Sequence, residues 1–184
     1  MEVVQETKRR LQANGYLRCF HEGKSGTLEG ANAAMTRSDI GEKFSIVILD
    51  NEDGGDDKTK GQIRIGEFVE TFYMNTMLWS QEKYKAHWRK ALSRLEECSF
   101  SSLAETVGDP KQHDYGKFWL FLREGDDIRI QQMLLVFDEC PGLVLEAPWE
   151  YFDESYFETG EDEEEGSEWE VSWYAVKDFL SHVH

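Results

Sequence analysis

The chain has 184 residues and a mass of 21.4 kDa, and its 40% hydrophobic and 13% aromatic content suits one well-packed domain and excludes a disordered chain. Its 37 acidic against 20 basic residues give a formal net charge of −17, which opposes direct binding to nucleic acid or to an anionic membrane. No apolar run approaches the roughly 18–20 residues that cross a bilayer, and Met1–Arg10 lacks the features of a secretory signal, so we expect a cytoplasmic protein.

The first 41 residues differ from the rest of the chain. They contain five glycines and no sustained helical or strand periodicity, and residues 1–40 carry six basic and five acidic residues. We therefore interpret residues 1–41 as a loosely ordered N-terminal arm and residues 42–184 as a single domain.

The domain is expected to begin with two strands and a helix. Phe44–Leu49 is a β-branched apolar run, and Gln62–Met74 resumes the alternation after a turn-rich acidic loop. Ser80 is a suitable N-cap for the next segment, in which apolar residues recur at helical spacing. This pattern predicts one amphipathic helix over residues 81–97, with Tyr84, Trp88, Leu92 and Leu95 on its apolar face.

The second half of the chain is expected to contain a hairpin, a last strand and a short helix. Phe118–Leu122 and Ile128–Phe137 flank a linker with Gly125, which is typical of a β-hairpin. Alternation across residues 169–173 predicts the last strand, and a short C-terminal helix follows from Val176. The fold class is therefore α+β, a mainly antiparallel sheet packed against one long amphipathic helix. The expected sheet core consists of Phe44, Ile46, Ile48, Ile63, Ile65, Phe118, Leu120 and Leu134.

A search for catalytic, cofactor and metal motifs gives none. The loop Asp50–Asp57 has the composition of a calcium loop, but EF-hand positions 5 and 12 would be Gly54 and Gly61. The histidines and cysteines have no metal-ligand spacing, and no phosphate-binding loop or nucleophile elbow is present. We interpret His87, which precedes Trp88 on the helix, as a partly buried structural residue. We predict no catalytic residue, no cofactor and no metal.

The strongest functional signal is an anionic region. Residues 130–176 contain 14 acidic residues and no Lys or Arg, although self-repulsion destabilises a compact state. Such a surface favours a cationic partner, for example a nuclease whose phosphate-binding cleft accepts carboxylates. The predicted contacts are two groups of carboxylates with aromatic anchors beside them. They are Glu158, Glu161, Asp162, Glu163, Glu164 and Glu165, then Asp53, Asp56 and Asp57, and the anchors Tyr151, Phe152 and Tyr156.

Residues between Phe44 and Leu180 also carry a family resemblance. The matching positions are Phe44–Ile46, Gly61–Phe72, Trp79, Tyr84, Trp88, Ala91, Leu92, Arg94, Leu95, Asp109, Pro110, Arg123–Asp126, Ile130–Gln132, Leu134, Leu135, Phe137–Glu139 and Ser167–Trp169. At these positions the sequence resembles the immunity proteins of bacterial contact-dependent growth inhibition (CDI) systems that have a CdiI N-terminal domain. Residues 1–41 have no counterpart in the family pattern.

The resemblance implies a non-enzymatic, cytoplasmic immunity protein. Its partner would be the cognate C-terminal toxin domain delivered by a neighbouring cell, often an RNase, whose active site it would block. A basic nuclease suits the anionic region, and no direct contact with nucleic acid or membrane is expected. Two alternatives stay open at this point: an acidic nucleic-acid mimic that inhibits another DNA or RNA enzyme, and a small carboxylate-dependent hydrolase.

Overall fold

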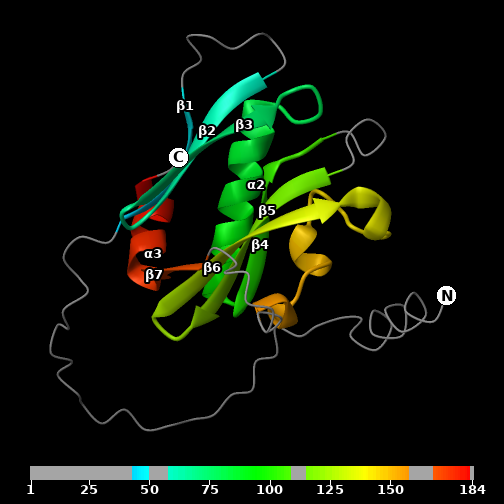
Figure 1. The fold of residues 1–184 in the computed structure, drawn as a ribbon. Helices are drawn as coiled ribbons and strands as arrows, with labels where there is room; N and C mark the ends of the chain where they lie inside the picture. Colours follow the sequence, from blue (N-terminus) through cyan, green and yellow to red (C-terminus); the bar gives the residue numbers. More distant parts are fainter. Residues whose placement is uncertain (1–42, 50–57, 109–114, 158–167, 183–184) are drawn as a thin grey trace, which may run out of the picture. The chain divides into compact units, whose positions relative to one another are not determined.

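The structure, a computed structural model, describes residues 43–49, 58–108, 115–157 and 168–182, which all belong to one compact unit of the chain (Figure 1). The predicted arm, residues 1–41, lies outside the described residues, so its boundary with the domain stays a prediction. The described part contains two antiparallel sheets and two α-helices, which confirms the predicted α+β class.

The first sheet has the order β1–β2–β3, with strands Phe44–Leu49, Lys58–Ile65 and Phe68–Asn75. The prediction of a single strand over residues 62–74 was wrong, because a turn at Gly66 and Glu67 divides that stretch into β2 and β3. Gly66 has a φ of 58°, a conformation that glycine adopts without strain. The turn pairs Ile65 with Phe68 and makes β2 the central strand of the sheet.

Helix α2, Gln81–Ser93, confirms the predicted amphipathic helix and continues as a 3-10 turn, η1, over Arg94–Glu96. Ser80 is its N-cap, and its hydroxyl accepts a hydrogen bond from the Lys83 backbone N–H at 3.3 Å. The predicted apolar face is buried, including Tyr84 and Leu92. Because residues three and four apart share a helix side, this periodicity alone fixed the buried face.

The second sheet has the order β4–β5–β6–β7, with strands Phe100–Thr106, Tyr115–Glu124, Asp127–Val136 and Glu168–Ser172. The hairpin β5–β6 confirms the prediction, and Gly125 in its turn has a φ of 71°. Strand β4 was not predicted from the sequence. The alternation also predicted Trp173 in the last strand, whereas this residue begins helix α3, Trp173–His182.

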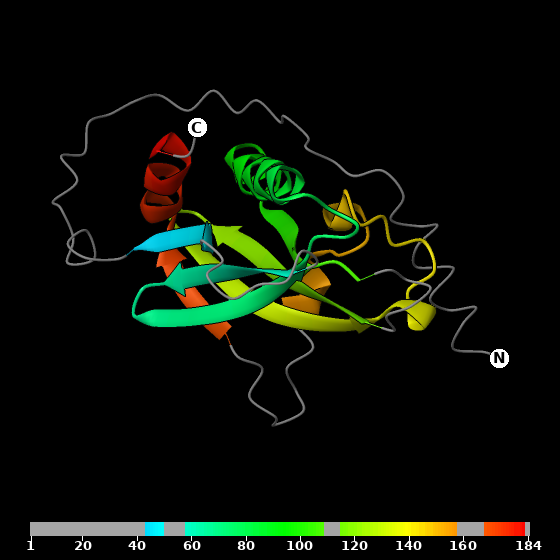
Figure 2. The same cartoon turned by 90° about the horizontal axis from the view of Figure 1, so that it is seen from above.

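The second sheet lies between two layers. On one face, Phe121 meets Phe44 of the first sheet, with ring centroids 6.0 Å apart, and Figure 2 shows α2 and α3 on the same side of the strands. On the other face, Phe118 packs against Phe152 at 5.4 Å, so the segment 137–157, with the 3-10 turns η2 (Phe137–Glu139), η3 (Pro148–Glu150) and η4 (Glu154–Phe157), covers the sheet. Both faces of β5 are therefore buried over its central residues.

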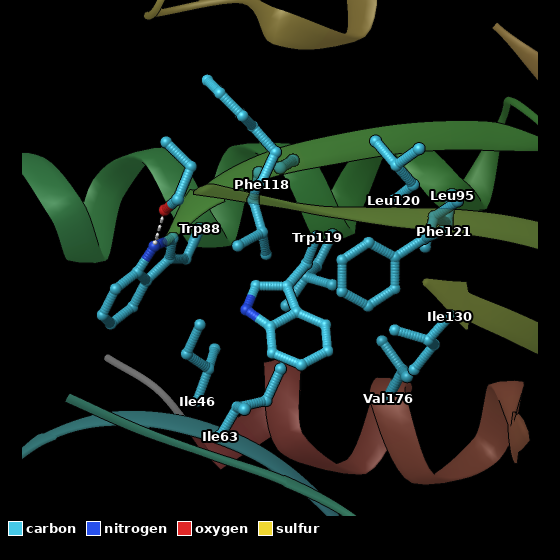
Figure 3. Packing of buried hydrophobic residues seen from close by; sticks show 14 of the residues in the cluster. Ile46, Ile63, Trp88, Leu95, Phe118, Trp119, Leu120, Phe121, Ile130 and Val176 are labelled. Atoms are coloured by element: carbon cyan, nitrogen blue, oxygen red, sulfur yellow. Dashed lines mark hydrogen bonds between the residues drawn. The ribbon is translucent and has the colours of Figure 1, made fainter. Parts of the chain in front are cut away.

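Figure 3 shows the centre of the core, where Trp119 and Phe121 of β5 lie between Ile63 and α2. Trp88 donates a hydrogen bond from its indole N–H to the Ala104 carbonyl at 2.8 Å, which fixes α2 on β4. Seven of the eight predicted sheet-core residues lie in or against this core, with Ile48 only half-buried. Leu134 was wrongly assigned to the core, because it is 59% exposed.

Candidate interaction site

Most of the predicted contact residues lie outside the described part of the chain. These are Glu158, Glu161, Asp162, Glu163, Glu164 and Glu165 of the acidic run, and Asp53, Asp56 and Asp57 of the first loop. Their role in binding a partner stays a prediction.

The three predicted aromatic anchors are described and differ in exposure. Tyr151 and Tyr156 are half-buried and flank Phe152, with ring centroids 5.5 and 5.1 Å from its ring. Phe152 itself is buried against Phe118 of β5, so we correct its assignment from partner contact to core residue. Burial raises the pKa of Tyr151 above its ordinary value of 10, and a hydrogen bond with Cys140 acts in the same direction, so this phenol stays protonated and able to donate.

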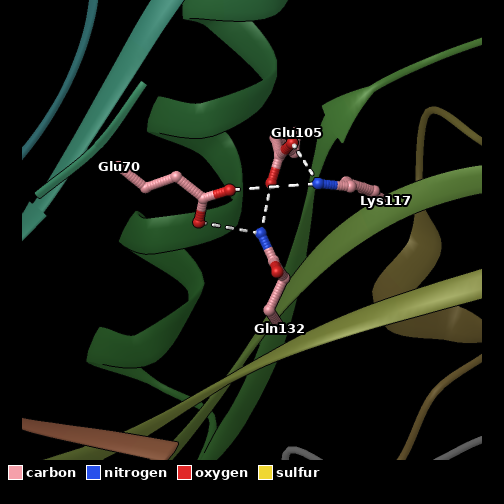
Figure 4. Close-up of polar contacts among 4 residues, drawn as sticks. All are labelled: Glu70, Glu105, Lys117 and Gln132. Atoms are coloured by element: carbon pink, nitrogen blue, oxygen red, sulfur yellow. Dashed lines mark hydrogen bonds and ion pairs between the residues drawn. The ribbon is translucent and has the colours of Figure 1, made fainter. Parts of the chain in front are cut away.

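A polar cluster joins the two sheets. It was not predicted from the sequence. Figure 4 shows Glu70 of β3, Glu105 of β4, Lys117 of β5 and Gln132 of β6 converging. The Gln132 side-chain amide donates to Glu70 Oε2 at 3.0 Å and to Glu105 Oε2 at 2.8 Å. Lys117 Nζ lies 3.9 Å from Glu70 Oε1 and 3.8 Å from Glu105 Oε1. One amide and one ammonium therefore hold two carboxylates that come from different sheets.

Local irregularity in β4 positions Glu105 in this cluster. The register with β5 shifts between Ala104 and Thr106, so Glu105 is the extra residue of a β-bulge. Burial raises the pKa of the Glu105 carboxyl above its ordinary value of 4.5, whereas Lys117 and the hydrogen bond from Gln132 act in the opposite direction. With both acids ionised, Glu70, Glu105 and Lys117 together carry one net negative charge.

This arrangement is suited to binding a cationic group. Among the described residues, no group of three or more His, Cys, Asp or Glu side chains could hold a metal ion. Both donor hydrogens of the Gln132 amide are already used by the two carboxylates, and Lys117 stands at the outer limit of ion-pair distance. Glu105 is only 1% exposed, so of the two acids Glu70, with 26% of its side chain exposed, is the one that a further cation can reach from outside.

Beside the cluster, three apolar side chains share one face of the β5–β6 hairpin. Tyr115 is paired with Val136 and Lys117 with Leu134, and side chains of directly paired residues lie on the same face. Leu134 is 59% exposed, Tyr115 52% and Val136 40%. We call Tyr115, Leu134 and Val136 the apolar strip. The apolar strip lies on the same face of the hairpin as the buried residues Trp119 and Phe121, but the first sheet does not cover it.

The predicted structural role of His87 is confirmed by its surroundings. Its Nε2 accepts a hydrogen bond from the Ala104 backbone N–H at 2.9 Å, and its ring stacks on Trp149 at 5.6 Å. Burial lowers the pKa of His87 from 6.5 to about 4, so the imidazole is neutral at physiological pH. The buried His87 ring therefore serves as a hydrogen-bond acceptor for the backbone of β4.

Two signals in the sequence point to the missed site. Gln132 interrupts an otherwise apolar half-strand, and Lys117 directly precedes the run Phe118–Leu122. A polar residue inside a buried strand usually has a buried partner. The partner carboxylates, however, lie 62 and 27 residues from Gln132 along the chain, and no local pattern connects them.

Comparisons with known proteins agree with the resemblance seen in the sequence. The family model described as the CdiI N-terminal domain matches residues 74–179. A curated relative, the immunity protein CdiI of Enterobacter cloacae subsp. cloacae, is 25% identical over 123 residues, which are 66% of this chain and 84% of the relative.

A solved structure, the CdiA-CT/CdiI toxin and immunity complex from Enterobacter cloacae, shares the fold with a TM-score of 0.61 at 22% identity. The match covers 76% of this chain and 97% of that one. Since the family model spans more than half of the chain, family membership is shown, and with it a non-enzymatic immunity protein instead of the hydrolase alternative. The chain belongs to the CdiI N-terminal domain family.

Proposed function

We propose that this protein neutralises a toxin by binding the C-terminal domain of its cognate CdiA protein. The observation that supports the proposal most strongly is the family match together with the fold shared with an immunity protein whose structure was solved in complex with a toxin. In this function the protein and the toxin domain form a stoichiometric complex, so the free energy of their association sets the strength of inhibition.

The toxin domain is proposed to be a basic nuclease whose active site the immunity protein blocks. The support is electrostatic, because a net charge of −17 disfavours association with most cellular anions and favours a cationic cleft. Carboxylates presented where phosphates bind compete directly with the nucleic acid, so a tight complex of this kind is also an inhibited one. The protein itself then needs no contact with nucleic acid.

The place of action is proposed to be the cytoplasm. Within the described residues, neither α-helix is long and apolar enough to span a membrane. A toxin that degrades nucleic acid acts in the cytoplasm, so its inhibitor has to be present there in folded form before the toxin arrives.

The carboxylates of the acidic run and of the first loop, with Tyr151 and Tyr156, are the proposed contact residues from the sequence. Phe152 is omitted because it is buried. Two half-buried tyrosines beside an acidic segment combine aromatic area with hydrogen-bonding hydroxyls, which is typical of interface hot spots.

The test is a co-purification and activity assay with the toxin domain encoded next to this gene. We expect a one-to-one complex in size-exclusion chromatography and a loss of RNA or DNA degradation in proportion to added immunity protein. An active toxin in the presence of a molar excess of this protein would contradict the function. A complex in which nuclease activity persists would retain binding and exclude active-site blocking.

A further inference from the structure

Strand β6 is longer than the strand that pairs with it on its outer side. Residues 127–131 of β6 pair with β7, whereas residues 132–136 pair with β5 only. No other described strand pairs with this second half. We call residues 132–136 the β6 edge. Its outer backbone groups point away from β5 with no partner strand among the described residues.

The β6 edge lacks the features that usually protect such edges. Natural edge strands carry charged residues, proline or a bulge, which discourage pairing with other chains. The β6 edge reads Gln-Met-Leu-Leu-Val, without charge or proline, and its pairing with β5 is regular throughout. Leu134 and Val136 on it are exposed, and Tyr115 widens the apolar strip across β5. An unprotected apolar edge of this kind is suited to accept a further strand.

The charge at the inner end of the edge favours a cationic partner. Gln132, the first residue of the edge, donates to both Glu70 and Glu105, whose only described cation is Lys117 at 3.8–3.9 Å. Glu105 is buried, but 26% of the Glu70 side chain is exposed, so a further ammonium or guanidinium can approach Glu70. In sequence, the stretch from residue 130 to residue 176, which includes the β6 edge, contains no Lys or Arg.

We propose that the toxin domain adds a strand to β6 at residues 132–136. Apolar side chains of that strand pack on Tyr115, Leu134 and Val136, and a Lys or Arg at its end pairs with Glu70, which Gln132 and Lys117 hold in place. Backbone hydrogen bonds of the added strand supply affinity, and the apolar strip with Glu70 supplies specificity. The inference rests on the proposed function, because it names the surface that the toxin occupies.

The first test compares one substitution on the β6 edge with the same substitution on the other sheet. Val136→Lys places a cation on the β6 edge, where it repels a cationic strand and disrupts apolar contact. Val47→Lys is the matched control, because Val47 lies on edge strand β1, is 38% exposed against 40% for Val136, and faces the neutral Gln62. Calorimetry with the purified toxin domain should show binding weakened by about thirtyfold or more for Val136→Lys, as for a central contact of an interface. Val47→Lys should bind within about threefold of the unsubstituted protein.

The second test reads the backbone directly by hydrogen exchange of the full-length protein with and without the toxin domain. Strand addition should protect amides of residues 132–136 that exchange in the free protein, and leave β1 unchanged. Equal affinity of both lysine variants, or binding without protection at residues 132–136, would overturn the inference while leaving the immunity function intact. A toxin domain that the unsubstituted protein neither binds nor inhibits would instead contradict the function itself.

Two other occupants of the β6 edge give distinct results. If another segment of this chain covers the edge, residues 132–136 are already fully protected in the free protein and the toxin adds nothing. If a second copy of the chain covers it, light scattering shows a dimer that Val136→Lys dissociates and Val47→Lys does not. Either result would overturn strand addition by the toxin.

Discussion

At the scale of single residues, His87 links the packing of α2 to pH. The folded pKa of about 4 lies below the ordinary value of 6.5, so the unfolded chain binds more protons between these two values. The contribution of neutral, buried His87 to the free energy of unfolding is therefore fully present above pH 6.5. It is lost as the pH falls from 6.5 to 4. Its total size corresponds to about 3 kcal/mol.

We expect urea unfolding to show a stability that declines from pH 7 to pH 4.5, and a shallower decline in His87→Gln, whose amide can still accept from Ala104. The matched control is His182→Gln, because His182 is largely exposed on the last turn of α3 and its removal should leave the slope unchanged. Equal slopes for His87→Gln and the unsubstituted protein would show that another group causes the loss of stability at low pH.

Glu105 is the residue on which the polar cluster depends. Replacing it by Ala leaves the Gln132 amide with one acceptor fewer and opens space at the bulge. Loss of a buried polar partner of this kind costs about 1–3 kcal/mol of stability. Glu124→Ala is the control, because Glu124 is exposed and lies 3.9 Å from Arg129, so its removal should cost less than about 0.5 kcal/mol.

Thermal unfolding followed by circular dichroism measures both variants. A melting temperature of Glu105→Ala equal to that of Glu124→Ala would show that Lys117 and Gln132 form replacement hydrogen bonds, with water or with each other, without loss of stability. The cluster would then be a feature of the surface and not of the junction between the sheets.

At the scale of elements, the close pairing of β2 and β3 depends on Gly61. This glycine faces Phe72 across the two strands, and a Cβ at Gly61 would overlap the Phe72 ring. The ring has little room to move away, because it is buried and packs edge-on against Trp88 at 6.2 Å. Gly61→Ala should therefore destabilise the fold by about 1–3 kcal/mol through overpacking.

A double-mutant cycle separates this cause from backbone effects. In the Phe72→Leu background the smaller side chain leaves space, so Gly61→Ala should cost less than in the natural background. Chemical denaturation measures all four proteins. An undiminished cost in the Phe72→Leu background would assign the effect to the strand backbone instead of the ring.

The elements show which parts of the fold a sequence reveals. Helix α2 and the hairpin β5–β6 were predicted because periodic apolar residues and turn glycines are local signals. Strand β4 was missed because five of its seven residues, the two serines, Ala, Glu and Thr, are small or polar, and yet the strand is buried on both faces. Leu134 continues a correct alternation, but the alternation does not say where the covering sheet ends.

The same reasoning explains the outcome for the site. The acidic run is a compositional feature and was visible at once, whereas the cluster of Glu70, Glu105, Lys117 and Gln132 draws one residue from each of four strands. Long-range assembly of this kind follows only from strand order and register. The β6 edge was equally hidden, because it exists only through the difference in length between β6 and β7.

At the scale of the whole molecule, the net charge of −17 should control association with the toxin. Replacing Glu161, Glu163 and Glu165 together by Ala removes three charges from the acidic run, and we expect weaker binding with a flatter dependence on salt. Glu96, Glu97 and Asp178, which are exposed on η1, its C-cap and α3, provide a triple Ala control with the same change in net charge.

Surface plasmon resonance at low and high salt measures the association rates of both triple variants. If the two variants lose affinity equally, the overall charge attracts the toxin and the acidic run has no special position. If neither loses affinity at any salt concentration, the run is a solvated segment outside the interface.

Strand β7 and helix α3 contact both sheets through aromatic side chains. Trp169 on β7 lies 4.3 Å from Phe68 of the first sheet and 5.3 Å from Trp119 of the second, and Phe179 on α3 packs against Phe44, near the start of the described residues. During translation, at about 5–20 residues per second, these contacts are impossible until residues 169–179 have left the ribosome. If the protein acts as proposed, a premature stop codon shortly before Trp169 should leave a cell as sensitive to the toxin as a deletion of the gene.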